Sequence, residues 1–335
     1  ECCRSDIRHK KQEVNIKIIN TFAMKISLIS AVISTLGSFA SASLLRTIDA
    51  DQSTVSDFNL KDEKKNTKRL GIVNGNEVDS SRYPYMVAWT SSRIIGKEGI
   101  RCGGSLIAED LVLTAAHCQS YELSKMQIGR HNLYDSGEDD HEEFYVTEQD
   151  QYPHELYGTG PDINYDFMIV KLRSSSSYEP VAINLDDVSL FGGEILHVTG
   201  WGTKSSGGEI SDVLMYVDLF YETNEVCQEK YFPRAIITNR MLCASDVVEG
   251  QDSCQGDSGG PLIIPGHNDT GKDDIQVGVV SWGFGCADPL YPGVYARISS
   301  VQFWITQKVC SLSKTPPSQY NCEAILANPV STKIE

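Results

Sequence analysis

Short apolar runs alternate with clusters of Gly, Asn, Asp and Ser between about residues 72 and 310. β-Branched and aromatic residues are frequent in the runs, and turn residues bound them, which is typical of strands. The clearest examples are Leu111–Thr114, Phe167–Leu172, Ile195–Thr199, Val213–Phe220, Val277–Trp282 and Val294–Ile298. The pattern indicates an all-β barrel or sandwich. Only Val301–Lys308 has a convincing helical pattern, and no repeat of fixed period is present.

The segments on either side of this region have a different texture. Residues 24–42 combine Met24-Lys25, a short apolar run and Ala40-Ser-Ala42, which is the order of a secretory signal peptide, with a signal anchor as the alternative. We expect residues 1–23 to be a leader outside the natural product. The polar residues 43–71 are typical of a propeptide. The tail, residues 311–335, contains Pro316-Pro317 and is expected to lie outside the core of the 72–310 domain, with pinning of its first part by Cys310 and Cys322 as the alternative.

Charge and cysteine content narrow the function classes. The formal net charge is −16, and the acidic excess lies after residue 71, so binding to nucleic acid or to an anionic membrane is disfavoured. Two of the ten cysteines, Cys2 and Cys3, fall in the leader. The other eight form an even set in an exported chain and predict disulfides, although spacing alone leaves the pairing open.

The stretch Gly256-Asp-Ser-Gly-Gly260 presents Ser258 in a G-x-S-x-G pattern that unrelated hydrolases share. A serine needs a base and a carboxylate that orients the base. His117 lies after an apolar run, among small residues and next to a cysteine, and Asp166 directly precedes another apolar run. We expect the remaining histidines of the domain to be surface or structural residues: His131, His141, His154, His197 and His267.

The order of these residues along the chain separates two folds. An α/β-hydrolase needs serine, then an acid, then histidine. The only histidine after Ser258 is His267, and no Asp or Glu lies between them, so the α/β-hydrolase fold is rejected. The order His117, Asp166, Ser258 is the order of the chymotrypsin-like enzymes.

From residue 72 to residue 310 the chain resembles the trypsin-like serine peptidases of the chymotrypsin family. The resemblance rests on the motifs IVNG, CGGSLI, LTAAHC, YDFMIVKL, VTGWGT, CQGDSGGPL, VSWGFGC and PGVYARI, in that order. It implies two packed antiparallel β-barrels with the active site in the cleft between them, followed by a C-terminal helix.

The resemblance also implies roles for individual residues. Ser258 would attack the scissile carbonyl, His117 would take its proton, and Asp166 would orient the imidazole. The backbone N–H groups of Gly256 and Ser258 would form the oxyanion hole. Asp252 would lie at the base of the primary pocket and favour Lys or Arg there.

Other matching positions concern the pocket walls and activation. Gly283 and Gly293 correspond to the walls, and Trp282 with Gly283 would pair with the substrate backbone. Cleavage before Ile72 would free an α-amino group that pairs with Asp257. Because Leu70 and Gly71 separate the basic pair Lys68-Arg69 from Ile72, we expect a different protease or a trimming step to complete activation.

The family pairing of cysteines implies the disulfides Cys102–Cys118, Cys227–Cys243 and Cys254–Cys286, which leaves Cys310–Cys322. The acidic stretch Asp135–Glu143 lies where many trypsins bind calcium, but Arg130 replaces a carboxylate ligand, so we expect a solvated loop and no metal. Asn268-Asp-Thr270 is a glycosylation sequon in a polar loop.

These observations predict a secreted, extracellular serine endopeptidase that is made as a zymogen and cleaves after Lys or Arg through an acyl-enzyme. The alternative is a catalytically silent homologue that acts as a binding or inhibitor protein. We expect a monomer without cofactors, whose partners are protein or peptide substrates, an activating protease and protein inhibitors, with no nucleic acid or membrane among them.

Overall fold

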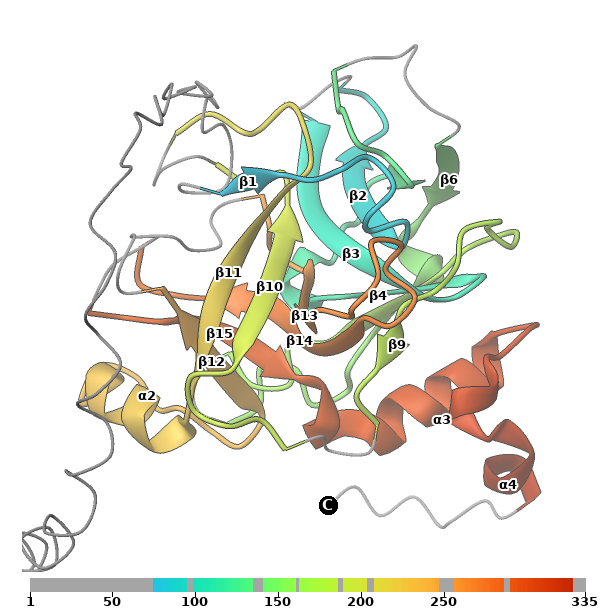
Figure 1. Cartoon of the computed structure of the whole chain (residues 1–335). Coiled ribbons are helices and arrows are strands. Elements are labelled where there is room, and N and C mark those ends of the chain that lie inside the picture. Colours follow the sequence, from blue (N-terminus) through green and yellow to red (C-terminus); the bar gives the residue numbers. More distant parts are fainter. Residues whose placement is uncertain are drawn as a thin grey trace, which may run out of the picture. The chain divides into compact units, whose positions relative to one another are not determined.

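Two mainly antiparallel β-sheets form the framework of the described residues (Figure 1). The computed structural model describes residues 75–94, 99–134, 141–160, 163–185, 189–203, 208–246, 256–285 and 290–327. The expected leader, signal peptide and propeptide, residues 1–71, lie outside the described residues. The expectation of an all-β fold with two packed, barrel-like sheets and a C-terminal helix is confirmed: one sheet closes into a barrel and the other is a curled half-barrel.

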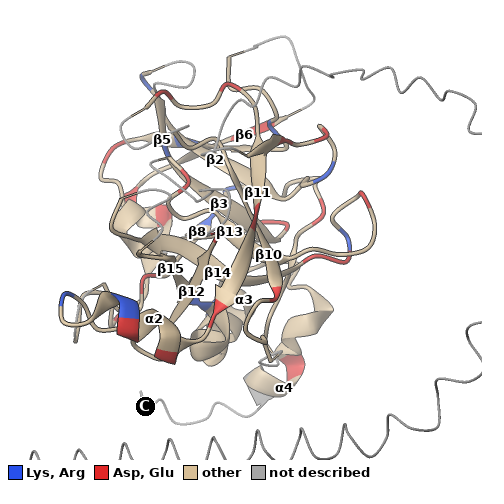
Figure 2. Cartoon of the chain, turned by 60° about the vertical axis from the view of Figure 1, so that its left-hand side comes forward, with Lys and Arg blue, Asp and Glu red and all other residues tan. Residues whose placement is uncertain are grey.

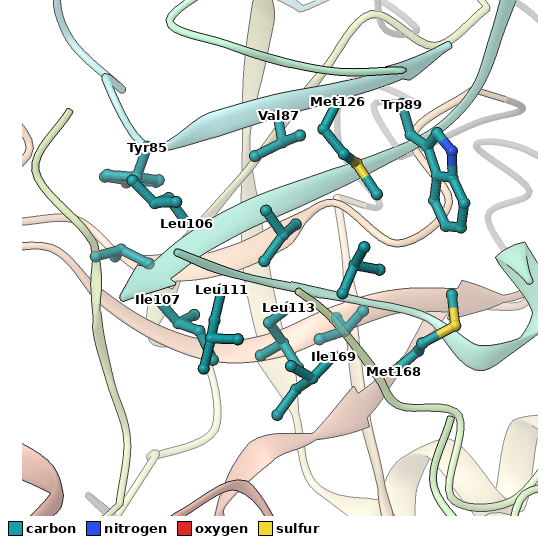
Figure 3. Close-up of a cluster of buried hydrophobic side chains, with 14 of the residues drawn as sticks. Tyr85, Val87, Trp89, Leu106, Ile107, Leu111, Leu113, Met126, Met168 and Ile169 are labelled. Carbon is teal, nitrogen blue, oxygen red and sulfur yellow. The ribbon is translucent and has the colours of Figure 1, made fainter. Parts of the chain in front are cut away.

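The first sheet has seven described strands and is curled without closing. Its order is β6 (Glu142–Val146), β5 (Ser124–Ile128), β2 (Met86–Ser91), β3 (Ile100–Ala108), β4 (Leu111–Thr114), β8 (Met168–Lys171) and β7 (Gln151–Pro153). Its strands enclose a core of aliphatic, aromatic and methionine side chains (Figure 3). Trp89 is fully buried in this core, and its indole N–H donates to Ser124 Oγ at 2.7 Å.

The second sheet closes on itself. Its order is β1 (Asn76–Glu77), β11 (Met215–Glu222), β10 (Ile195–Gly200), β13 (Pro261–Ile264), β14 (Ile275–Trp282), β15 (Gly293–Arg297) and β12 (Met241–Ser245). Strand β12 also pairs with β11, which completes a ring of six strands. A short strand, β9 (Ala182–Ile183), runs parallel to β14. β11 alternates buried and less buried positions, as a strand with one face in a core must.

The helices correct two expectations from the sequence. Helix α3 (Gln302–Leu312) matches the expected late helix, but α2 (Asn224–Tyr231) and α4 (Cys322–Ala327) were missed. Helix α2 buries only two side chains, Cys227 and Tyr231, which is too few to produce a helical pattern of apolar residues in the sequence. The described residues also form the 3₁₀ segments η2 (Ala116–Cys118), η3 (Glu148–Asp150), η4 (Ile298–Val301) and η5 (Ser318–Tyr320).

The expectation that the tail lies outside the core is wrong for its first part. Tyr320 is 2% exposed and belongs to the first core, and its hydroxyl donates to Ile107 O at 3.3 Å. A disulfide, Cys310–Cys322, joins α3 to α4, and the two helices lie side by side (Figure 1). Tail residues therefore pack against the first sheet as an integral part of the fold.

A buried carboxylate fastens the tail to the turn between β3 and β4. Asp110 forms an ion pair with Lys171 of β8 and accepts hydrogen bonds from Ser313 Oγ at 2.7 Å and from Lys314 N at 3.0 Å. Burial opposes ionisation of Asp110, but Lys171 and the two tail donors hold its pKa below the usual value. The charged form of Asp110 is thus the form that the fold stabilises.

Charge elsewhere is dispersed. Acidic positions occur on α2, on α4 and in many loops of the described residues (Figure 2). Within the described residues, no helix is both long enough and apolar enough to cross a membrane.

We predict that Asp110→Asn lowers the free energy of unfolding by about 3 kcal/mol, because it leaves the Lys171 ammonium without its partner in a largely buried setting. Urea denaturation of the full chain measures this difference. The matched control is Glu109→Gln, since exposed Glu109 also contacts the tail through Thr315 Oγ1 at 2.8 Å. The control should change stability by less than about 0.5 kcal/mol. Equal effects of the two substitutions would contradict the assignment.

Candidate active site

The pairing of β4 with β8 brings a histidine and an aspartate together. The two strands are antiparallel, with Thr114 opposite Met168. His117 follows the end of β4 by three residues, and Asp166 precedes β8 by two, so both lie at the same end of the ladder. The His117 Nδ1 atom lies 2.7 Å from Asp166 Oδ2, and the backbone N–H of His117 donates to Oδ1 at 2.9 Å.

The Asp166 carboxylate is fully buried, and both of its oxygens accept hydrogen bonds. Its side chain has no exposed surface, whereas 25% of the His117 side chain is exposed. Ser281 Oγ donates to Asp166 Oδ2 at 2.5 Å. Burial and, next, the charge of Asp166 raise the pKa of Tyr157. Three donors therefore stabilise a buried carboxylate, while the imidazole that it binds keeps one edge toward solvent.

The loop that carries Ser258 is wedged against the same end of the first sheet. Gly103 N, on β3, donates to Ser258 O at 2.7 Å, and Gly259 N donates to Val280 O at 2.9 Å. Gly259 has a φ of +80°, and a Cβ there would collide with Thr114 Oγ1, at the end of β4. Only glycine fits this position. The loop thus joins the second sheet to the strand end that precedes His117.

A disulfide also lies beside His117. Cys102 on β3 is bonded to Cys118. These two sulfurs and the His117 imidazole lie within 4.8 Å of one another, a spacing that could suggest a metal site. The sulfurs are bonded to each other and are not thiolates, so this group does not have the donor set of a zinc site.

The aspartate before the serine is buried in a glycine-lined space. Asp257 is fully buried, and Gly202 N donates to its Oδ1 at 2.8 Å. A Cβ on either Gly200 or Gly202 would collide with the carboxylate. The glycines of the VTGWGT motif therefore make room for Asp257. Its expected partner, Ile72, lies outside the described residues.

The residues expected to wall the primary pocket also lie together. Gly283 follows β14 and Gly293 begins β15, and a Cβ on Gly283 would lie 3.9 Å from Gly293 Cα. Trp282 packs edge-on to Tyr231 of α2, with ring centroids 5.1 Å apart, and Tyr231 OH donates to Pro292 O at 2.6 Å. Helix α2 therefore packs against the residues that precede Gly283 and Gly293.

Asp252, Cys254 and Cys286 lie outside the described residues. The other expected disulfide of the second sheet, Cys227–Cys243, is present.

Most of the acidic stretch that we expect to be a solvated loop, namely residues 135–140, is likewise outside the described residues. Arg130, which replaces a carboxylate ligand there, is 7% exposed, and its Nη1 lies 2.6 Å from His141 Nε2. The expectation of no metal stays a prediction.

His154 has a structural setting next to Asp166. Its ring stacks on Tyr165 at 4.8 Å and packs on Trp304 at 4.7 Å, and Tyr165 adopts a φ of 55° just before Asp166. Leu156 N donates to His154 Nδ1 at 3.1 Å, which fixes the proton of the neutral ring on Nε2. The stack therefore supports an unusual backbone turn from which Asp166 projects.

Two features of the site were not predicted. Ser281 belongs to the VSWGFGC motif, and its position beside Trp282 was the signal that could have directed attention to it. The His154–Tyr165 stack had no signal, because neither residue lies in a pattern that links the two.

Comparison with known proteins shows the family to which the chain is similar. Residues 72–305 match the family model described as Trypsin. Trypsin 5G1 of Aedes aegypti is 35% identical over 242 residues, which cover 70% of this chain and 84% of that protein. Trypsin of Squalus acanthias is 34% identical over 248 residues (72% and 97%), and the vitellin-degrading protease of Bombyx mori is 34% identical over 259 residues (73% and 89%).

We predict that acidification weakens the fold through His154. Burial lowers its pKa from 6.5 to about 4, with Arg240 and Lys308 acting in the same direction and Glu155 opposing them. In the unfolded chain His154 is protonated below pH ~6.5, whereas in the folded chain it stays neutral down to about pH 4. The stability that the neutral, packed ring contributes is therefore present above pH ~6.5 and is lost as the pH falls. The free energy of unfolding should therefore be lower at pH 5 than at pH 7.

The contribution of His154 is isolated by comparing how the free energy of unfolding varies with pH in the wild type and in His154→Asn. Asn can accept the Leu156 N–H bond but does not titrate, so its slope between pH 7 and 5 should be flatter, even if the lost stacking lowers stability overall. The wild-type contribution should stay below about 1.4 kcal/mol per pH unit, the value for one proton. His267→Asn, at an exposed site, is the control and should keep the wild-type slope. A wild-type slope in His154→Asn would refute the prediction.

Proposed function

Because the chain belongs to the trypsin family and is a serine-type endopeptidase, we propose that it is secreted, is made as a zymogen and cleaves peptide bonds after Lys or Arg. The observation that carries the proposed catalytic assignment is the hydrogen bond between His117 and the buried Asp166, at the strand end against which the Ser258 loop is wedged. The match to trypsins favours the enzyme over the binding-protein alternative.

The proposed chemistry is the mechanism established for the family. The Asp166 carboxylate accepts a hydrogen bond from the N–H at Nδ1 of His117, which leaves Nε2 free of a proton and able to accept the Ser258 hydroxyl proton. Ser258 Oγ then attacks the scissile carbonyl, and His117 passes the proton to the leaving amine. Water repeats the sequence on the acyl-enzyme. Asp166 stabilises the imidazolium that forms at each step.

We assign the oxyanion hole to the backbone N–H groups of Gly256 and Ser258. Gly256 has a φ of +102°, which side-chain-bearing residues rarely adopt, and a Cβ there would lie 3.1 Å from Gly202 Cα. Glycine thus permits the turn that directs its N–H inward. Fixed donors of this kind stabilise the negative charge that develops on the substrate oxygen.

The specificity for Lys or Arg is assigned to Asp252, within a pocket that Gly283 and Gly293 border. A Cβ on Gly283 would meet no atom closer than 3.9 Å. We propose that the missing side chains of Gly283 and Gly293 leave space for a long substrate residue. A carboxylate in such a pocket needs a cationic partner, because burying it alone is costly. Protein substrates follow from the family, whereas an activating protease and protein inhibitors are proposed partners.

Zymogen activation is assigned to an α-amino group at Ile72, which would pair with Asp257. The buried, glycine-lined setting of Asp257 supports this role, because a cation that enters there gains a strong interaction in a dry site. Secretion is supported by the signal-like residues 24–42. The segments 43–71 and 311–335 are proposed as propeptide and C-terminal tail around the peptidase domain, residues 72–310.

The test of this proposal is hydrolysis of a peptide-substrate library by the processed protein, whose first residue is checked by N-terminal sequencing. We expect Ile72 at the N-terminus of the active form and a preference for Arg and Lys over Phe and Leu before the cleaved bond. Asp252→Ser should reduce the Arg-over-Phe ratio of kcat/KM by more than about 100-fold, because the cation loses a buried partner worth about 3–5 kcal/mol. Ser258→Ala is the inactive control. A preference for Phe in the wild type would reject the specificity, and full activity with Leu70 at the N-terminus would reject the activation step.

We also predict that Ser281 is a positioning residue. Removing its hydrogen bond to Asp166 in Ser281→Ala leaves the carboxylate less fixed, so kcat should fall about 10-fold, the equivalent of one hydrogen bond to a charged group, while KM changes by less than about twofold. Steady-state kinetics with an Arg substrate separates the two constants. The control is Ser311→Ala, an exposed serine on α3, which should retain both constants. An unchanged kcat in Ser281→Ala would exclude the role.

A further inference from the structure

The loop that joins β13 to β14 carries the sequence Asn268-Asp-Thr270, and no other Asn-x-Ser/Thr sequence without proline at x occurs in the chain. His267, Asp269 and Thr270 are exposed, and Asn268 is half-buried. This sequence is the acceptor signal for N-linked glycans. The catalytic role proposed above does not use the loop, so its function is a separate question.

The base of this loop is held firmly on the protein. Asp274 is fully buried and accepts hydrogen bonds from Arg82 at 2.6 and 2.8 Å, from Tyr85 OH at 2.6 Å and from Gly266 N at 2.7 Å. Gly271 has a φ of +74°, and a Cβ there would lie 2.8 Å from Arg82 O. The loop therefore packs inward at Gly271 and Asp274, and its Asn268–Thr270 side faces solvent.

The side chain of Asn268 is already arranged for substitution on nitrogen. Its Oδ1 accepts hydrogen bonds from Thr270 N at 3.0 Å and from Thr270 Oγ1 at 2.8 Å. Its Nδ2 donates to Asp273 Oδ2 at 2.5 Å. An amide nitrogen has two hydrogens, so this bond uses one and the other can be replaced by a sugar carbon without loss of any of these contacts.

We propose that Asn268 carries an N-linked glycan, an inference that rests on the proposed entry of the chain into the secretory route. The co-reactant is a lipid-linked oligosaccharide diphosphate. The Asn268 Nδ2 atom forms a bond to the anomeric carbon, the bond from that carbon to the diphosphate oxygen breaks, and the lipid diphosphate leaves with the electron pair. Nδ2 loses one proton. The product is a neutral, bulky and hydrated group at the solvent side of the loop.

The glycan lies away from the candidate active site. Strand β14 separates the loop from Trp282 and spans eight residues, which at about 3.3 Å per residue places the two ends on the order of 20 Å apart. A glycan on Asn268 therefore leaves substrate access open, and glycosylated and unglycosylated enzyme should have the same kcat/KM.

The test is secretion of the full chain from a eukaryotic host behind a host signal sequence, so that entry into the secretory lumen does not depend on residues 24–42. We expect the mass of the secreted protein to fall on treatment with an amidase that removes N-linked glycans, with conversion of Asn268 to Asp in the peptide map. Activity of the same samples is measured separately, so failure of the proposed function and failure of glycosylation give different results.

Matched variants at the hydroxyl position make the result specific. Thr270→Ser retains the hydroxyl and should retain the glycan, whereas Thr270→Val has nearly the same shape without the hydroxyl and should lose it, as should Asn268→Gln. Secreted wild-type protein whose mass does not change on treatment would overturn the proposal. A glycan that persists in Thr270→Val or Asn268→Gln would also overturn it.

Discussion

The antiparallel ladder between β4 and β8 is the constraint on which the rest of the site depends. It sets Thr114 opposite Met168, and with that register His117 and Asp166 emerge at one strand end. A slip of one residue would turn every side chain of β8 to the opposite face of the sheet. All four residues of β4 are buried, so the packing of the first core resists such a slip. The hydrogen bond between His117 and Asp166 is therefore a consequence of core packing.

The second constraint is the close approach of the two sheets. A Cβ on Gly103 would lie 3.1 Å from Gly260 Cα, and one on Gly259 would collide with Thr114 Oγ1. The paired glycines of CGGSLI and of the serine loop are thus needed for one contact, in which backbone meets backbone. Ser258 lies in the loop that leads into β13 of the second sheet, but this contact places it against the first sheet. The site can exist only where both sheets are folded and packed.

The sequence predicted the fold where its patterns were local. Strand β4 was expected at its observed bounds, because a short apolar run between turn residues is a strong signal. Strand β2 was not singled out, because it ends in the polar residues Thr90 and Ser91, and only its pairing with β3 and β5 buries them. Helix α2 is stabilised by packing around Tyr231 more than by its own pattern. Tertiary contacts decided both cases, and a single sequence does not display them.

The candidate site followed the same division. His117, Asp166 and Ser258 lie in motifs whose order along the chain carries information, so they could be proposed without coordinates. Ser281 was missed because a lone serine at a strand end has many structural roles, and only its 2.5 Å hydrogen bond to Asp166 distinguishes it. The packing of His154 on Tyr165 was unpredictable for the same reason.

Both ends of the β4–β8 ladder end on a buried carboxylate. At one end Asp166 binds His117 and Ser281, and at the other Asp110 binds Lys171 and the backbone of Lys314. A buried carboxylate is stable only when its donors are in place, so each one penalises any shift of the strands that carry those donors. The tail supplies two of the donors at the end remote from His117. Residues beyond the matched family region thus help to hold the strand register that the hydrogen bond between His117 and Asp166 requires, although they lie at the opposite end of the ladder.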